Sequence, residues 1–570
     1  IACNTDDESH QPSLLPRKVI MYPTINELFQ QSVASYRDSV VLRMLIPKER
    51  KRGRGIHLIL NEISYGRLGE RVARLASALS ELGVNKGDRV ALISRPRAAW
   101  ATAFFAILHC GATAVPLDPE LQQAEIERIL AEAGVKGVIV SGEKLAGLES
   151  TKQDFATDLF LISMDRPATE DTLFLDALLL NKKPLPCVDT SPDDPAILMY
   201  TSGTTGNAKG AVLTHANIAS NALACRKVVD LSTRDNFLSI VPWHHIYGLT
   251  VTLITPVISG GTTTYAPVDH NLAQVMLKAR PTMLLGVPKL YHVLYGKISA
   301  SISKSLIKKT INRLSPTLMG KLLTRKLFGK DFRFLVCGGA PLNNEVVKGF
   351  RRMGIGMLEG YGLTETSPVL AMCEQFPSEP GMIAIEGVEL QIDHPDKDGV
   401  GEIIARGPGI MSGYYKNPEA TRAVISEDGW FHTGDLGSLV SNNRILISGR
   451  AKNVIVLETG KNVYPEEVEW ELSTIPAIEE IMIYEGERQG APAVAAMIYP
   501  SWPTLNKLEI SESNDAIDHI WKEVKERSEN LAMFKRIKNR DLITLTDQPF
   551  EKSVKLDIKR FLYKKNTADS

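Results

Sequence analysis

Helix and strand patterns alternate along most of this chain, and that alternation limits the fold more than any other feature. Between residues 64 and 83, apolar side chains recur at spacings of four and three, which predicts an amphipathic helix that ends at Gly83. Those side chains are Leu68, Val72, Leu75, Leu79 and Leu82. The apolar strand DRVALIS, a second helix in AAWATAFFAILHCG and a strand in GATAVPLDP follow in turn. We therefore expect an α/β fold of parallel-rich sheets layered with helices.

The length of the chain and a change near residue 450 predict two domains of unequal size. A chain of 570 residues exceeds what one hydrophobic core usually serves. The stretch ISGRAKNVIV carries a strand, a Gly-Arg turn and a second strand, and the sequence beyond it is more highly charged. We place a large N-terminal domain at 1–450 and a small α/β C-terminal domain at 451–570.

Composition argues against several classes of function. The chain is 44% hydrophobic and 23% charged, which is ordinary for a folded globular protein. Basic and acidic residues are equal at 66 each, which gives no sign of a nucleic-acid partner. The six cysteines are far apart, which indicates reduced thiols, and no apolar run is long enough to span a membrane. These features predict a cytoplasmic protein.

One segment, 297–330, is strongly basic, with nine Lys or Arg residues and no acid. Ile298, Ile302 and Leu306 are spaced so that they would share one face of a helix. Two interpretations stay open. The segment is either a basic amphipathic surface that meets anionic lipid at the inner face of the membrane, or a solvated helix pair packed on the body of the protein.

The stretch YTSGTTGNAKG, Tyr200 to Gly210, has the composition of an anion-binding loop. Small residues allow backbone N–H groups to approach a phosphate, hydroxyls add donors, and Lys209 adds charge. The spacing of Lys209 from the glycines differs from that of a Walker A loop. Taken alone, a Gly/Thr-rich loop of this kind is also compatible with a plain linker. The residues that would hold phosphates are Thr201, Ser202, Gly203, Thr204, Thr205, Gly206 and Lys209.

This loop resembles the signature of the adenylate-forming enzymes, which include acyl-CoA synthetases, firefly luciferase and the adenylation domains of peptide synthetases. The family usually has Pro where this chain has Ala208. Further strings resemble family motifs in the family's order: ISYGRLGERVARLASAL, VPWHHIYG, CGGAPL, EGYGLTETSP, GWFHTGDLG and GRAKNVIVLETGKNVYPEEVE. The last of these strings and the tail look most like those of bacterial long-chain fatty acid–CoA ligases.

The resemblance implies a reaction in two steps. A carboxylic acid attacks the α-phosphate of ATP with Mg²⁺ present, pyrophosphate leaves, and the thiol of coenzyme A then displaces AMP from the acyl-adenylate. Negative charge spreads over phosphates in the first step, so we expect catalysis by positioning and by supplied cations. Glu365 matches the family's Mg²⁺ ligand, and Thr204 is a second metal-site candidate, because hard oxygen donors suit that ion. Thr364 would touch the α-phosphate.

The same resemblance assigns residues to the nucleotide and to the acid. The adenine and acyl pocket would be lined by Gly338, Gly339, Ala340, Glu359, Gly360, Tyr361 and Gly362. Tyr361 would stack on adenine, and Asp435 would accept hydrogen bonds from both ribose hydroxyls, with Arg450 nearby. His245 matches a residue near the carboxylate tunnel, and a buried structural role is the alternative. Lys452 matches the hinge about which the small, mobile domain rotates between the half-reactions.

The tail, PFEKSVKLDIKRFLYKK, departs from the family at one position. When Glu551 and Arg560 are aligned with the matching residues of the family's tail motif, the position of the family's catalytic lysine falls on Asp557. Three explanations stay open: an acid beside phosphates impairs adenylation, Lys555 or Lys559 replaces the lysine, or Asp557 is an engineered or mis-recorded change. Residues two apart in an extended segment share a face and lie about 7 Å apart. A small shift of the chain would therefore bring Lys555 or Lys559 to the position of the family's catalytic lysine.

The leading hypothesis is an ATP-dependent ligase that joins a long-chain fatty acid to coenzyme A. Medium-chain and aromatic acids remain open as substrates, and an acyl carrier protein could replace coenzyme A as the acceptor. A hypothesis of another class is a catalytically silent nucleotide- or acyl-binding protein, which Asp557 motivates.

Overall fold

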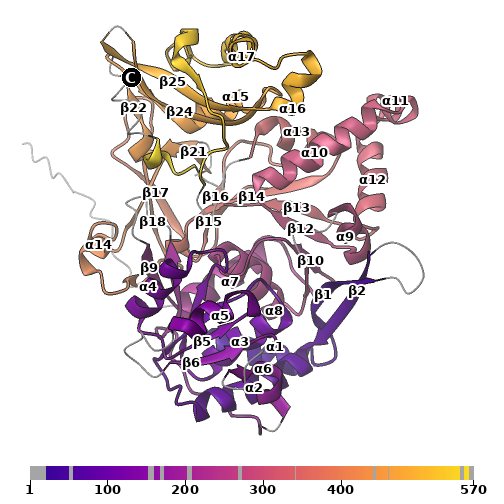
Figure 1. Cartoon of the computed structure of the whole chain (residues 1–570), viewed down its shortest axis with the longest axis vertical. Helices are drawn as coiled ribbons and strands as arrows, with labels where there is room; N and C mark the ends of the chain where they lie inside the picture. The colour runs from indigo at the N-terminus through magenta and orange to yellow at the C-terminus, as the bar shows by residue number, and fades with distance from the viewer. Residues whose placement is uncertain are drawn as a thin grey trace, which may run out of the picture.

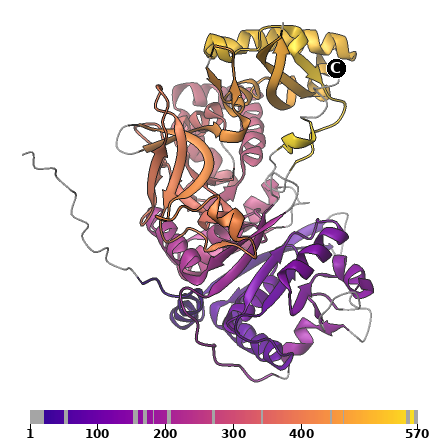
Figure 2. The same cartoon turned by 90° about the vertical axis from the view of Figure 1, so that its left-hand side faces the viewer.

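The computed structural model confirms a mixed α/β fold with a large N-terminal and a smaller C-terminal part. The described residues are 21–49, 56–151, 159–166, 172–180, 182–201, 208–266, 272–339, 342–440, 444–459, 461–488, 490–552 and 558–563. Figures 1 and 2 show the N-terminal part at one end of the long axis and the C-terminal part, drawn in orange and yellow, at the other.

The first large sheet has eight strands in the order β19-β9-β8-β4-β3-β5-β6-β7, and all pairs from β8 to β7 are parallel. Its strands are β19 (Gly413–Tyr414), β9 (Lys209–Thr214), β8 (Pro195–Thr201), β4 (Thr113–Leu117), β3 (Arg89–Ile93), β5 (Gly137–Val140), β6 (Phe160–Ser163) and β7 (Leu173–Phe174). The predicted helix is confirmed as α2 (Tyr65–Glu81), capped by the Ser64 side chain, and it packs on α3 (Ala98–His109). Leu68, Val72 and Leu75 on its apolar face are fully buried.

The second large sheet has nine strands in the order β16-β15-β14-β13-β12-β10-β11-β1-β2, with a parallel centre from β14 to β1. Its strands are β16 (Ile383–Ala384), β15 (Val369–Met372), β14 (Gly356–Gly362), β13 (Phe334–Cys337), β12 (Met283–Gly286), β10 (Asn236–Ser239), β11 (Thr262–Tyr265), β1 (Val40–Glu49) and β2 (Ile56–Ser64). The remaining helices of the N-terminal part include α1 (Ile25–Ser35), α4 (Gln123–Ala133), α5 (Gly142–Thr151), α6 (Leu175–Leu180), α7 (His215–Val228), α8 (Thr255–Ile258), α9 (Leu272–Ala279), α13 (Asn344–Arg352) and α14 (Pro418–Arg422).

An antiparallel sheet and a separate C-terminal core complete the fold. The antiparallel sheet consists of β17 (Glu389–Asp393), β18 (Gly401–Arg406), β20 (Phe431–Val440) and β21 (Arg444–Arg450). The C-terminal elements are β22 (Ile455–Val456), β23 (Asn462–Val463), α15 (Pro465–Leu472), β24 (Ile478–Arg488), β25 (Ala491–Pro500), α16 (Trp502–Leu505), α17 (Ser513–Arg527) and β26 (Ile543–Leu545). Buried residues from Ile455 to Ile543 form a hydrophobic cluster of their own. The domain boundary at residue 450 and the hinge at Lys452 stay predictions.

The basic segment forms three helices, which corrects one detail of the sequence analysis. They are α10 (Pro288–Ser303), α11 (Leu306–Leu314) and α12 (Pro316–Leu327). Ile298 and Ile302 are buried on α10, but Leu306 begins a new helix and is 84% exposed. The shared face was wrong because the Ser305 side chain accepts a hydrogen bond from the Lys308 N–H and starts α11 there. Within the described part of the chain, no helix is both long and apolar enough to cross a bilayer.

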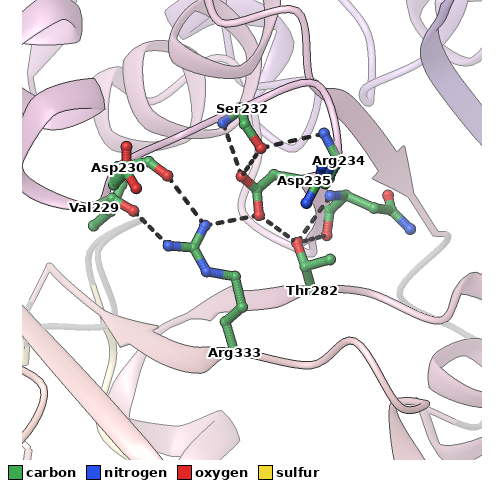
Figure 3. Close-up of polar contacts among 8 residues, drawn as sticks. Val229, Asp230, Ser232, Arg234, Asp235, Thr282 and Arg333 are labelled. Atoms are coloured by element: carbon green, nitrogen blue, oxygen red, sulfur yellow. Dashed lines mark hydrogen bonds and ion pairs between the residues drawn. The ribbon is translucent and has the colours of Figure 1, made fainter.

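A buried carboxylate joins the beginnings of three neighbouring parallel strands (Figure 3). Asp235, Thr282 and Arg333 each stand directly before a strand, namely β10, β12 and β13. The Asp235 carboxylate accepts hydrogen bonds from Arg333 at 2.9 Å, from the Thr282 hydroxyl at 3.1 Å and from the Ser232 N–H at 2.9 Å. Arg333 also donates to the Val229 carbonyl at 2.8 Å. The network therefore fixes one edge of the sheet and leaves the opposite, carboxyl edge to other residues.

We predict that Asp235→Ala lowers the free energy of unfolding by about 2–4 kcal/mol, because it removes the buried acceptor that Arg333, Thr282 and the Ser232 N–H share. Asp331→Ala serves as the control, since Asp331 is exposed in the same region, and a change within about 0.5 kcal/mol is expected. Urea unfolding followed by tryptophan fluorescence measures both variants. Equal effects of the two substitutions would contradict the structural role of Asp235.

Candidate active site

One group of the predicted site residues lies at the carboxyl ends of the parallel strands of the nine-stranded sheet. His244 and His245 follow β10, Gly338 and Gly339 follow β13, and 359–362 form the end of β14. Thr364 and Glu365 come next, in the short 3₁₀-helix Thr364–Thr366. Since the carboxyl ends of parallel strands lie at one edge, strand order brings these segments together.

A hydrogen-bonded cluster links Tyr361, Asp435 and Arg450, which the sequence analysis assigned to the nucleotide. The Tyr361 hydroxyl donates to one oxygen of Asp435 at 2.9 Å, and Arg450 Nε lies 2.7 Å from the other. The Asp435 carboxylate is almost fully buried. The backbone N–H of Asp435 donates to the Thr433 hydroxyl at 3.1 Å. Burial, together with the charge of Asp435, raises the pKa of Tyr361 well above its usual value, so the phenol stays a proton donor. The cluster therefore holds the carboxylate in one orientation beside an aromatic ring.

A second cluster joins the predicted Mg²⁺ ligand to the predicted phosphate loop. The Tyr414 hydroxyl donates to a Glu365 oxygen at 2.8 Å, and Lys209 Nζ lies 5.2 Å from the centre of the Tyr414 ring. Tyr414 lies on β19, where it pairs with Ala211 of β9. Burial, and then the charge of Glu365, raises the pKa of Tyr414. Tyr414 lies in the stretch MSGYYKNPEAT, whose local pattern gives no sign of this bond to Glu365.

The ends of the predicted phosphate loop are fixed by a hairpin. Thr201 ends β8, Lys209 begins β9, and the two residues are partners across the antiparallel pair. The Thr201 hydroxyl donates to the Lys209 carbonyl at 3.3 Å. Ser202, Gly203, Thr204, Thr205 and Gly206 lie outside the described residues, so their assignment to phosphates, and that of Thr204 to the metal, stays a prediction.

Two of the predicted pocket glycines stand where a side chain would collide with a neighbour. A Cβ at Gly338 would lie 3.0 Å from the ring of Tyr247, and a Cβ at Gly362 would lie 1.7 Å from the Pro368 carbonyl oxygen. The glycine at 338 therefore leaves room for Tyr247. Glu359 is largely buried, and burial raises its pKa, opposed by Arg351 at 3.7 Å. Ala340 lies outside the described residues, and its pocket role stays a prediction.

His244, His245 and Asp118 form a third group at this edge of the sheet. Their ligand atoms lie within 4.8 Å of one another, and the two imidazole rings are 4.4 Å apart. His244 is buried, and its Nε2 lies 3.6 Å from an Asp118 carboxylate oxygen. His245, the predicted site residue, is half-buried. The structure thus surrounds His245 with an imidazole and a carboxylate.

The predicted hinge and tail residues lie on or beside the C-terminal part. Lys452 is exposed in the 3₁₀-helix Ala451–Asn453, directly after Arg450. Lys559 Nζ lies 3.7 Å from the Glu551 carboxylate, and Arg560 donates to Glu469 at 2.6 Å. Lys555 and Asp557 lie outside the described residues, so the choice among the three explanations for Asp557 stays open.

The described donors fit a magnesium–nucleotide complex. Mg²⁺ is usually held by one or two carboxylates together with substrate phosphates and water. Glu365 supplies one half-buried carboxylate, oriented by Tyr414, and Lys209 supplies positive charge over the face of the Tyr414 ring. Glu365 would hold the ion, and the bound ion would supply charge neutralisation at the phosphates.

Comparison with known proteins decides the family. Residues 46–415 match the AMP-binding enzyme family, and residues 452–569 match the AMP-binding enzyme C-terminal domain. The chain belongs to the AMP-binding enzyme family. Enzymes of this adenylate-forming family use ATP, Mg²⁺ and coenzyme A, and the chain falls in their acid–thiol ligase class.

The relatives of this AMP-binding enzyme act on different kinds of acid. Feruloyl-CoA synthase from Amycolatopsis sp. is 31% identical over 461 residues, which cover 78% of this chain and 82% of the relative. A long-chain-fatty-acid–CoA ligase of Mycobacterium tuberculosis is 28% identical over 451 residues, which cover 76% and 83%. ATP-bound MatB from Rhodopseudomonas palustris has the same fold, with a TM-score of 0.75 and 23% identity over 96% of this chain and 99% of that one.

We predict that the buried imidazole of His244 makes the fold sensitive to mild acid. Burial lowers its pKa to about 3, whereas a histidine in the unfolded chain titrates near pH ~6.5. Between these values the unfolded chain binds a proton that the folded chain does not bind, so stability falls as pH falls. His244→Phe should therefore lose less stability than the wild type from about pH 7 to about pH 5.

Urea midpoints measured across that range check this prediction. His394→Asn is the control, because the side chain of His394 is 95% exposed, and this variant should follow the wild type. Parallel declines of the wild type and His244→Phe would show that His244 does not carry the effect.

Proposed function

We propose that this AMP-binding enzyme activates a fatty acid, most specifically a long-chain one, to an acyl-adenylate and then transfers the acyl group to coenzyme A. The products are acyl-CoA, AMP and pyrophosphate. The observation that carries the proposal is the closeness of the two clusters: Tyr361, which holds Asp435, stands four residues before Glu365, which Tyr414 orients. A nucleotide bound by its ribose at one cluster would place its phosphates toward the other.

In the first step, a carboxylate oxygen of the acid forms a bond to the α-phosphorus, and the bond from that phosphorus to pyrophosphate breaks. The chain's own contribution is to position and neutralise charge. Asp435 would accept hydrogen bonds from the ribose hydroxyls, while Arg450 and Tyr361 hold its carboxylate. Lys209 and the N–H groups of its loop would bind the phosphates. Thr364, buried beside Glu365, would contact the α-phosphate.

In the second step, the sulfur of coenzyme A forms a bond to the acyl carbon, AMP leaves with the bonding electron pair, and the thiol proton is released. AMP is a better leaving group than the oxygen of a free carboxylate. The AMP that is joined to the acid in the first step is therefore the group that leaves in the second step. Rotation about Lys452 would exchange the tail for the segment near Glu458 at the site. An acyl carrier protein as the acceptor is the alternative at this step.

The acid is the least constrained part of the proposal. The tail motif and the long-chain relative favour a fatty acid, whereas the feruloyl-CoA synthase at 31% identity favours an aromatic acid. His245, with His244 and Asp118 beside it, would lie near the carboxylate of either acid. A panel of acids therefore distinguishes the two candidate functions.

We predict that the purified chain catalyses ATP–pyrophosphate exchange with long-chain fatty acids, and that Glu365→Gln lowers the exchange by about 10²-fold through loss of the Mg²⁺ ligand. Glu386→Gln is the control, because Glu386 makes an exposed ion pair with Lys227 away from the site. Faster exchange with ferulate or coumarate than with any fatty acid would replace the fatty-acid proposal with the aromatic one. Exchange that is insensitive to Glu365→Gln would contradict the assigned site.

We predict that Asp557→Lys raises the rate of adenylation and leaves the transfer of a supplied acyl-adenylate to coenzyme A unchanged, since the late lysine serves only the first step. Asp547→Lys, an exposed position in the same domain, is the matched control and should change neither rate. If replacing Lys555 or Lys559 by Gln lowers the ATP–pyrophosphate exchange of the wild-type chain, the role of the catalytic lysine would be assigned to that residue. Equal changes in both half-reactions of Asp557→Lys would contradict the prediction.

A further inference from the structure

Helices α11 and α12 form an arm at the edge of the molecule (Figure 1). All residues of α11 are described, and none is buried. Among its side chains, the half-buried Ile311 packs on the neighbouring hydrophobic cluster, and Lys308 donates to the Ser301 hydroxyl at 2.7 Å. The next helix is held more firmly, by the buried Met319.

The outer side of this arm exposes large aliphatic residues. Leu306, Ile307 and Leu314 on α11 are 84%, 74% and 80% exposed, and Leu318 and Leu322 on α12 are 48% and 50% exposed. A single exposed leucine needs no explanation, but several on two consecutive helices mark a surface that is covered in use. We call these five residues the apolar face of the arm.

The same segment carries many exposed positive charges. The exposed basic residues of the segment are Lys297, Lys304, Lys309, Arg313, Lys321, Arg325, Lys326 and Lys330. The segment 297–330 contains no acid, and in the described part of the chain none of its basic residues forms an ion pair. Helix α13, which packs against α12, adds Lys348 and Arg352 beside a single acid, Glu345. The charge is therefore not neutralised by the protein itself.

We propose that α11 and α12 dock on a membrane that contains anionic lipid. The exposed Lys and Arg side chains would bind headgroup phosphates, and Leu306, Ile307 and Leu314 would enter the boundary between headgroups and acyl chains. An acidic protein would match the charge but would leave these aliphatic side chains facing a charged surface. The combination of exposed aliphatic and unpaired basic residues therefore favours lipid. This docking does not depend on the proposed reaction.

Vesicle flotation with the full chain, without ATP or a carboxylic acid substrate, tests the proposal. The chain should bind vesicles of phosphatidylcholine with phosphatidylglycerol and not vesicles of phosphatidylcholine alone, and added salt should weaken the binding. Lys309→Gln with Arg313→Gln should lower vesicle affinity by about 25-fold, at about fivefold per charge. Leu306→Gln, Ile307→Gln and Leu314→Gln together should lower it by about tenfold or more.

The matched control replaces equally exposed apolar residues elsewhere, Leu180→Gln with Met533→Gln, and should bind as the wild type does. Circular dichroism confirms that each variant is folded. The proposal would be overturned if the wild-type protein did not bind anionic vesicles, or if it bound neutral vesicles equally well. Retention on immobilised polyglutamate without vesicle binding would assign the surface to an acidic protein instead.

Discussion

The parallel strands of the nine-stranded sheet must begin in register, and the buried carboxylate of Asp235 provides that constraint. It ties the residues before β10, β12 and β13 to one another through Thr282 and Arg333. Parallel strands that begin together end together, so the segments after them share one edge. The candidate active site is built from those segments and lies at the opposite ends of the same strands.

The two clusters of the site draw on different sheets. Tyr361 lies in β14 of the nine-stranded sheet, and Glu365 follows that strand. Asp435 and Arg450 come from the antiparallel sheet, and Tyr414 and Lys209 come from the eight-stranded sheet. Two hydroxyl–carboxylate bonds join these three sheets at one place. Arg450 also stands at the end of β21, immediately before the predicted hinge, so the nucleotide side of the site is adjacent in the chain to the backbone that would rotate.

Helix α10, which precedes the arm of α11 and α12, is anchored to the strands that carry the site. The hydroxyl of Tyr291, on α10, lies 2.8 Å from the Leu284 carbonyl oxygen and 2.6 Å from that of Val336, in β12 and β13. The inner helix α10 is therefore fixed to the sheet, whereas α11 extends outward with its aliphatic residues exposed. A membrane-bound arm would hold the whole sheet, and the edge that carries the site, near the source of an apolar acid.

The sequence alone determined the family and, for helices such as α2, the local structure. The spacing of Leu68, Val72 and Leu75 dictates one buried helix face, because side-chain period and solvation act over short distances. The motifs around Lys209 and Glu365 were enough to predict the site residues from the sequence. Only the tertiary structure decided that Tyr361 bonds Asp435, that Tyr414 orients Glu365, and that Leu306 faces outward. These depend on strand order and register between distant segments, and no local pattern encodes which apolar face a neighbour will cover.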